Sequence, residues 1–105
     1  MANWLRACSV DEVPPGGSRE VAVGGRVIAL FNVGGDIYAL DGVCPHAGGP
    51  LGEGRLEGSI VTCPWHGWQF DVCTGRHCLN PNLVQPSYRT RIDGDEILVE
   101  LPELP

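Results

Sequence analysis

Two short segments each place a cysteine and a histidine close together: Cys44-Pro-His46 within VCPHAGGPLGEG, and Cys63-Pro-Trp-His66 within VTCPWHGWQFD. Sixteen residues separate the two pairs. The glycines around the first pair disfavour helix and strand, so we expect a loop there. Thiolate and imidazole groups are soft or borderline ligands that select a transition metal or an iron–sulfur cluster. The chain must therefore fold so that two loops bring four ligands together.

The remainder of the chain predicts short strands joined by tight turns. Its 105 residues suit one domain, and its 15 glycines and 9 prolines favour turns over long helices. Runs of β-branched and aromatic residues are separated by the hairpin signals Gly24-Gly25, Gly34-Gly35-Asp36 and Asp93-Gly94-Asp95. We expect a three-stranded meander over residues 19–40, with further strands at residues 4–9, 88–92 and 96–101.

The two ends of the chain share this strand-rich texture, whereas the middle is rich in glycine loops. We therefore expect an all-β protein of a single domain, residues 1–105. Its base would be a small antiparallel β-barrel or sandwich made from about residues 1–41 and 81–105. About residues 42–80 would form an inserted subdomain that carries both Cys–His pairs.

Three interpretations of the four ligands compete. In a [2Fe–2S] cluster of the Rieske arrangement, one iron takes two thiolates and the other takes two imidazoles. In a mononuclear zinc site, two cysteines and two histidines would surround one ion, but common zinc modules pair like ligands with like. In the third interpretation, the cysteines are core thiols and the histidines lie on the surface. Two mixed pairs in matching contexts favour the cluster.

At these residues the sequence resembles the Rieske iron–sulfur family. CPHAGGPLGEG is similar to its first box, C-x-H, and CPWHGWQFD to its second, C-x-x-H-G-x-x-[FY]-D. FDVCTG and the closing YRTRIDGDEILVEL extend the resemblance over nearly the whole chain. The resemblance implies a Rieske fold in which Cys44 and Cys63 bind the inner iron, and His46 and His66 bind the outer iron, of one [2Fe–2S] cluster per chain.

Two departures from the quinol-oxidising branch of this family are informative. That branch adds a cysteine to each box, forming a disulfide, whereas the matching positions here are Gly49 and Trp65. It also places serine and tyrosine hydroxyls beside the cluster sulfurs, where this chain has Trp68 and Phe70. Hydrogen bonds to the sulfurs stabilise the reduced cluster, so their loss lowers the potential. We expect a value near the bottom of the Rieske range of about −150 to +300 mV.

The resemblance implies a Rieske-type ferredoxin of a multicomponent oxygenase, which is an electron-transfer component and not itself an enzyme. It would pass single electrons from an NAD(P)H-dependent flavin reductase to a terminal, ring-hydroxylating oxygenase. The alternative is the small Rieske-like subunit of an NADH-dependent assimilatory nitrite reductase. A zinc-stabilised interaction module is a third interpretation.

Composition limits the partners and the location. The formal net charge of −6 argues against nucleic acid, because phosphate binding needs a basic surface. The apolar runs are too short for a membrane span, and the N-terminus lacks the pattern of a signal peptide. We therefore expect a soluble cytoplasmic monomer with no membrane partner.

Four other residues have simpler interpretations. Cys8 alternates with apolar neighbours and is expected in the core. Cys73 and Cys78 flank the Thr74-Gly75 turn and are expected to be reduced thiols rather than a disulfide. His77 has no partner at ligand spacing and is expected on the surface.

Overall fold

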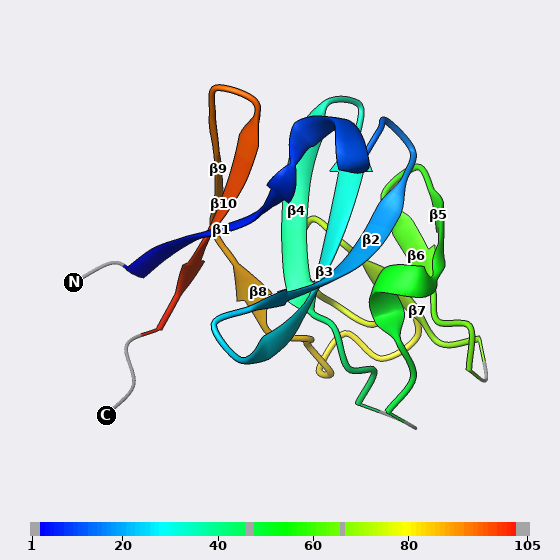
Figure 1. The fold of residues 1–105 in the computed structure, drawn as a ribbon. Helices are drawn as coiled ribbons and strands as arrows, with labels where there is room; N and C mark the ends of the chain where they lie inside the picture. Colours follow the sequence, from blue (N-terminus) through cyan, green and yellow to red (C-terminus); the bar gives the residue numbers. More distant parts are fainter. Residues whose placement is uncertain (1–2, 46–47, 66, 103–105) are drawn as a thin grey trace.

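The computed structural model describes residues 3–45, 48–65 and 67–102. These residues form an all-β fold in which every strand pairing is antiparallel, which confirms the expected class (Figure 1). Two 3₁₀ helices are η1 (Val10–Glu12) and η2 (Leu51–Glu53). The strands are β1 (Asn3–Ser9), β2 (Ser18–Val23), β3 (Arg26–Val33), β4 (Asp36–Asp41), β5 (Arg55–Glu57), β6 (Ile60–Thr62), β7 (Gln69–Asp71), β8 (Ser87–Tyr88), β9 (Thr90–Asp93) and β10 (Glu96–Leu101).

The strands form three sheets, with the orders β1-β10-β9, β2-β3-β4-β8 and β5-β6-β7. The predicted meander is confirmed as β2, β3 and β4, whose hairpins turn at Gly24-Gly25 and Gly34-Gly35. All four of these glycines have positive φ, from 56° to 102°, which two-residue hairpin turns of the primed type require. The first and last strands pair directly, with Asn3 opposite Leu101, so both ends of the chain build one sheet.

Strand β3 separates two hydrophobic cores because its side chains alternate between its faces. Ile28 and Leu30 enter the first core, which also holds side chains of β1, β2, β4 and β10. Ala29 and Phe31 enter the second core, which also holds Cys44 and Cys63. All four β3 side chains are fully buried. A register slip of one residue would exchange the two sets, so the pairing of β3 is strongly specified.

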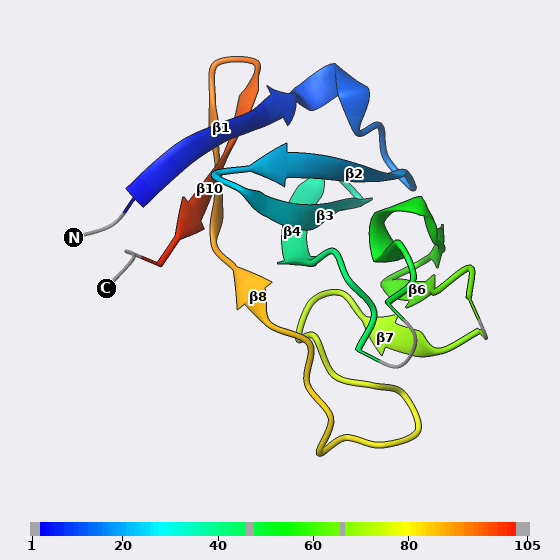
Figure 2. The same cartoon turned by 60° about the horizontal axis from the view of Figure 1, so that its bottom comes forward.

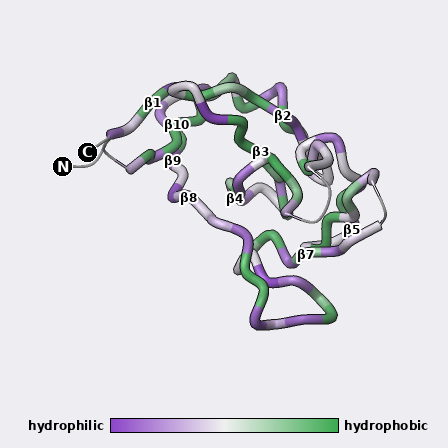
Figure 3. The backbone as a smooth tube through the Cα atoms, turned by 90° about the horizontal axis from the view of Figure 1, so that it is seen from below, coloured by the Kyte–Doolittle hydropathy of each residue, from purple (hydrophilic) through white to green (hydrophobic). Residues whose placement is uncertain are grey.

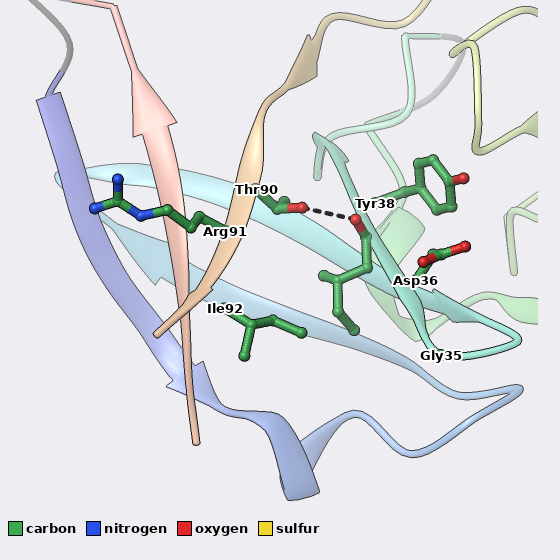
Figure 4. Close-up of a pocket in the computed structure, with 7 residues that line it drawn as sticks. Gly35, Asp36, Tyr38, Thr90, Arg91 and Ile92 are labelled. Carbon is green, nitrogen blue, oxygen red and sulfur yellow. Dashed lines mark hydrogen bonds between the residues drawn. The ribbon is translucent and has the colours of Figure 1, made fainter. Parts of the chain in front are cut away.

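The chain crosses from the second sheet to the first between β8 and β9. Strand β8 pairs with β4 at Ala39–Tyr88 and Leu40–Ser87, and β9 then pairs with β10. Beyond this crossing, the Thr90 Oγ1 hydroxyl donates to the Ile37 carbonyl oxygen at 2.7 Å, across a pocket between β4 and β9 (Figure 4). This side-chain bond joins the two sheets where their backbones no longer pair.

The sheet of β5, β6 and β7 lies on the side of β3 opposite the β1-β10-β9 sheet (Figures 1 and 2). Val61 and Phe70, which face each other across β6 and β7, are fully buried in the second core. The loops that follow β4 and β6 carry the two cysteines of the Cys–His pairs. No helix within the described ranges is long and apolar enough to cross a membrane.

Candidate [2Fe–2S] site

Cys44 and Cys63 come from different loops and meet in the second core. Each side chain is only 1% exposed, and the Cys44 thiol lies within hydrogen-bond reach of Cys63. Burial, and then the neighbouring Cys44 thiol, raise the pKa of Cys63, while a hydrogen bond from the Trp65 backbone N–H to its sulfur opposes this rise. The structure therefore brings together the two predicted thiol ligands, with a backbone N–H already directed at one sulfur.

The first cysteine loop is a tight turn closed by its own backbone. The Cys44 N–H donates to the Gly49 carbonyl oxygen, and the Gly48 N–H donates back to the Cys44 carbonyl oxygen, both at 2.9 Å. Val43 and Pro50 form an isolated bridge directly outside this turn. These bonds hold the Cys44 backbone in place.

Gly49 allows the two cysteine loops to touch. A Cβ atom at this position would lie 2.9 Å from the Cys63 sulfur and 2.9 Å from the Cβ and Cγ atoms of Trp65. Real Cβ contacts essentially never come this close, so any side chain would displace the second loop. The second loop is itself closed by the Cys63 N–H, which donates to the Trp68 carbonyl oxygen at 2.8 Å. Two facing thiols beneath a side-chain-free backbone fit a cluster that takes two thiolates on one iron.

The other two predicted ligands, His46 and His66, lie outside the described residues. Of the four predicted ligands, the structure describes the two cysteines.

His77 corrects one expectation, because it is buried and not on the surface. Its side chain is 8% exposed and makes edge-to-face contacts with Trp68 and Phe70, at centroid distances of 4.6 and 5.2 Å. Its Nδ1 accepts the backbone N–H groups of Leu79 and Asn80, each at 3.1 Å. An Nδ1 that accepts two hydrogen bonds carries no proton, so the ring is the neutral Nε2–H tautomer. The described residues offer no hydrogen-bond partner to this buried Nε2.

Sequence patterns contained a signal for this burial. Phe70 and His77 form a bridge across the FDVCTG hairpin, so their side chains lie on the same face of the sheet. Phe70 is fully buried, so its cross-strand neighbour is buried with it.

Gln85 is a buried residue of the site that sequence reasoning missed. It is 2% exposed, and its Nε2 donates to the carbonyl oxygens of Asp41 and Val43, both at 2.7 Å. Its backbone N–H donates to the Gly75 carbonyl oxygen, also at 2.7 Å. Gln85 belongs to the segment NPNLVQPS, residues 80–87, which we call the proline-rich loop. This loop is therefore joined both to the start of the first cysteine loop and to the FDVCTG hairpin.

The remaining cysteines behave as expected. Cys8 is buried in the first core at 4% exposure. Cys73 and Cys78 are exposed free thiols. They lie at different levels of the hairpin, since Cys78 is bonded to Gln69 through its backbone N–H and Cys73 lies in the turn.

Known proteins match this chain over nearly its whole length. Residues 3–101 match the family described as the Rieske [2Fe–2S] domain. The ferredoxin component of a naphthalene 1,2-dioxygenase system from Pseudomonas aeruginosa is 37% identical over 93% of this chain and 95% of its own length.

Two solved structures show the same fold. The first is a complex of reduced oxygenase and oxidised ferredoxin in carbazole 1,9a-dioxygenase; the matching chain is 33% identical over 92% of each chain, with a TM-score of 0.82. The second, from Mycobacterium tuberculosis, is described as the small subunit of an NADH-dependent nitrite reductase; it is 25% identical over 99% of each chain, with a TM-score of 0.88.

The resemblance seen in the two Cys–His boxes thus extends to the fold and to the full length of the chain. This protein belongs to the Rieske [2Fe–2S] domain family and is an electron-transfer protein with a single [2Fe–2S] cluster.

Proposed function

We propose that this protein is a Rieske-type ferredoxin that carries one electron at a time to a terminal oxygenase. The observation that carries the proposal is the meeting of the Cys44 and Cys63 thiols in a shared core beneath Gly49. These two cysteines would bind the inner iron, and His46 and His66 the outer iron. When bound, the cluster takes up and releases a single electron with no change of bonds elsewhere in the chain.

We also propose a division of the chain into a base and a cluster-binding subdomain. About residues 42–80 form the cluster-binding subdomain, and about residues 1–41 and 81–105 form the base. The small β5-β6-β7 sheet, which pairs with neither sheet of the base, supports this division.

The proposed donor is an NAD(P)H-dependent flavin reductase, and the proposed acceptor is a ring-hydroxylating oxygenase. The acceptor is supported by relatives that serve dioxygenase systems as ferredoxin components and by a ferredoxin solved in complex with its oxygenase. We further propose that the protein works in the cytoplasm as a monomer, because its charged surface is dominated by acids that repel a second copy.

The proposed midpoint potential is near −150 mV, at the bottom of the Rieske range. Trp68 and Phe70 occupy the positions where a hydroxyl would stabilise the reduced state, and neither side chain has an O–H group. A flavin reductase can supply electrons at this potential, whereas quinol oxidation needs a considerably higher one.

An anaerobic redox titration of the purified protein, followed by its visible spectrum and by electron paramagnetic resonance, tests the proposal. The expected result is one-electron behaviour near −150 mV, with loss of the cluster in Cys44→Ser and its retention in Cys78→Ser. The second variant is a matched control, since Cys78 is an exposed free thiol. A midpoint above about +100 mV would refute the assignment to oxygenase systems, and a colourless, zinc-containing protein would refute the cluster.

A second candidate function is that of a small subunit in an NADH-dependent nitrite reductase. It is favoured by the fold likeness to the Mycobacterium tuberculosis protein, but the sequence is closer to the dioxygenase ferredoxins. Electron delivery to a sirohaem reductase, and none to an oxygenase, would favour this second function.

A further inference from the structure

The ring of His77 has two nitrogens, and the loop contacts use only one of them. Nδ1 accepts the N–H groups of Leu79 and Asn80, which lie where the proline-rich loop begins. That loop projects from the rest of the backbone (Figure 3). The proton of the neutral ring is therefore on Nε2, which is buried and has no hydrogen-bond partner among the described residues. A buried donor left unpaired destabilises a fold, so a partner of another kind is expected beside it.

The aromatic rings that pack on His77 offer such a partner. Trp68 lies at a centroid distance of 4.6 Å with an interplanar angle of 81°, and Phe70 at 5.2 Å with 87°. In perpendicular pairs of this kind, the positive edge of one ring points at the negative face of the other. An N–H group directed at a ring face forms a weak hydrogen bond. Trp68 is the better acceptor of the two, because it is nearer and its indole face attracts positive charge more strongly than a phenyl face does.

Trp68 connects His77 to the second cysteine loop. Its carbonyl oxygen accepts the Cys63 N–H at 2.8 Å, and its half-buried side chain packs against the core that holds Cys44 and Cys63. Its ring also lies 6.4 Å from the ring of Phe70, tilted by 48°. His77, Trp68 and Phe70 thus form one continuous group of rings, which we call the aromatic wall. The aromatic wall borders the core of the two cysteines.

An apolar wall beside a cluster affects the potential of that cluster. The apolar surroundings of a metal site control the access of water and thereby its redox potential. A cluster gains one negative charge when it is reduced, and water that reaches it stabilises this more negative state and raises the potential. A wall that stays closed keeps the potential low, which agrees with the value proposed above.

We propose that His77 is a positioning residue for the redox centre: its Nε2–H donates to the π face of Trp68 and holds the aromatic wall closed beside the cysteine loops. This inference rests on the proposed function, because it places the cluster at Cys44 and Cys63. The two nitrogens of one ring then have separate roles, since Nδ1 holds the loop that follows and Nε2–H holds the wall. Neither role requires His77 to gain or lose a proton.

Three substitutions separate the two roles. His77→Asn keeps an acceptor, Oδ1, at the distance of Nδ1 from the backbone but has no donor as far out as Nε2. His77→Gln keeps an N–H donor at the distance of Nε2 but has no acceptor at the distance of Nδ1. His77→Leu is apolar and has neither group. Leu79→Ala is the control, because its side chain is 90% exposed on the same loop.

Two measurements are made on each whole protein with its cluster. An anaerobic redox titration, followed by the visible spectrum and by electron paramagnetic resonance, gives the midpoint potential. Amide hydrogen exchange gives the protection of the Leu79 and Asn80 N–H groups, which reports whether the loop is held.

We expect the potential to follow the donor and the protection to follow the acceptor. In His77→Asn and His77→Leu, the equilibrium constant for reduction should rise by at least about threefold, which is about 28 mV at 59 mV per tenfold change. In His77→Gln and Leu79→Ala it should stay within about 1.5-fold of the native value. The two N–H groups should remain protected in His77→Asn and lose protection in His77→Gln and His77→Leu. A purely structural residue would change both measurements together.

Three results would overturn the inference. Potentials of His77→Asn and His77→Leu within about 1.5-fold of the native value would show that Nε2–H does not hold the wall, and either variant is sufficient for this comparison. A His77→Gln variant that shifts as far as these two would show the same. A fall in the potential of His77→Asn and His77→Leu would mean that the N–H acts on the cluster directly and not through Trp68. All three leave the proposed function standing, whereas failure of the proposed function shows as a native protein without a cluster, or as a cluster retained in Cys44→Ser.

Discussion

Replacing Gln85 by leucine should loosen the proline-rich loop from the first cysteine loop. Leucine fills a similar volume but has no donor, so the carbonyl oxygens of Asp41 and Val43 would each lose a partly buried 2.7 Å bond. A buried group left without its partner costs about 1–3 kcal/mol. We expect a loss of about 2–4 kcal/mol in the free energy of unfolding, below the upper limit for two groups because each carbonyl keeps a second lone pair. This is a large share of the roughly 5–15 kcal/mol that stabilises a domain.

Urea unfolding, followed by visible absorbance and by tryptophan fluorescence, measures this loss. For a slope of about 2 kcal/mol per molar urea, the midpoint should fall by about 1–2 M. Gln69→Leu is the control, because Gln69 is exposed and donates only to the Thr62 hydroxyl at 3.1 Å; we expect a change below about 0.5 kcal/mol. If the Gln85→Leu midpoint stays within about 0.2 M of the native value, Gln85 does not hold the two loops together.

Two further predictions concern a glycine and a buried thiol. Gly75 has a φ of 81°, and a Cβ there would collide with the Gln85 carbonyl oxygen, whereas Gly58 has a φ of 60° and open space around it. Gly75→Ala should therefore destabilise the protein more than the roughly 1–2 kcal/mol of left-handed strain that we expect for Gly58→Ala; equal urea midpoints for the two variants would contradict the collision. Burial, followed by the Glu12 carboxylate, raises the pKa of Cys8. Above about pH 8.5 the unfolded chain therefore releases a proton from this thiol that the folded chain retains. As a result, the free energy of unfolding falls as the pH rises. Between pH 7 and about pH 9.5, the free energy of unfolding of the native protein should fall by up to about 1.4 kcal/mol more than that of Cys8→Ala, as measured from urea midpoints. If the two proteins show parallel pH profiles, Cys8 makes no contribution to the pH dependence of stability.

The hairpins of the base could be predicted because their turns are local. Gly24-Gly25 and Gly34-Gly35 mark hairpins through the backbone conformations that only glycine adopts easily, and the flanking runs then define the strands. Strand β5 was not expected, because Arg55 and Glu57 are exposed and leave only Leu56 to indicate a buried face.

The candidate site could be predicted only in part. Cys44 and Cys63 could be identified because the sequence itself shows their spacing to the histidines. The structure brings the two thiols together. The burial of His77 and Gln85 was not predicted because both are polar, and their burial depends on partners supplied by the fold. The carbonyl oxygens that accept from Gln85 belong to residues 44 and 42 positions away in sequence, so no local pattern indicates them. Such side chains are identified only from the folded structure, which shows which buried backbone carbonyl groups need a donor.

The pairing of β1 with β10 has a consequence for how this protein can be joined to others. Both strands lie in the base, so the chain enters and leaves the fold on the side away from the cysteine loops (Figure 1). A reductase or an oxygenase fused at either end through a flexible linker would leave the cysteine loops free to turn toward the fused partner. The linker would replace diffusion by an effective concentration in the millimolar range. The arrangement of the base thus allows the protein to be fused to an electron-transfer partner without a change to any residue beside the cysteines.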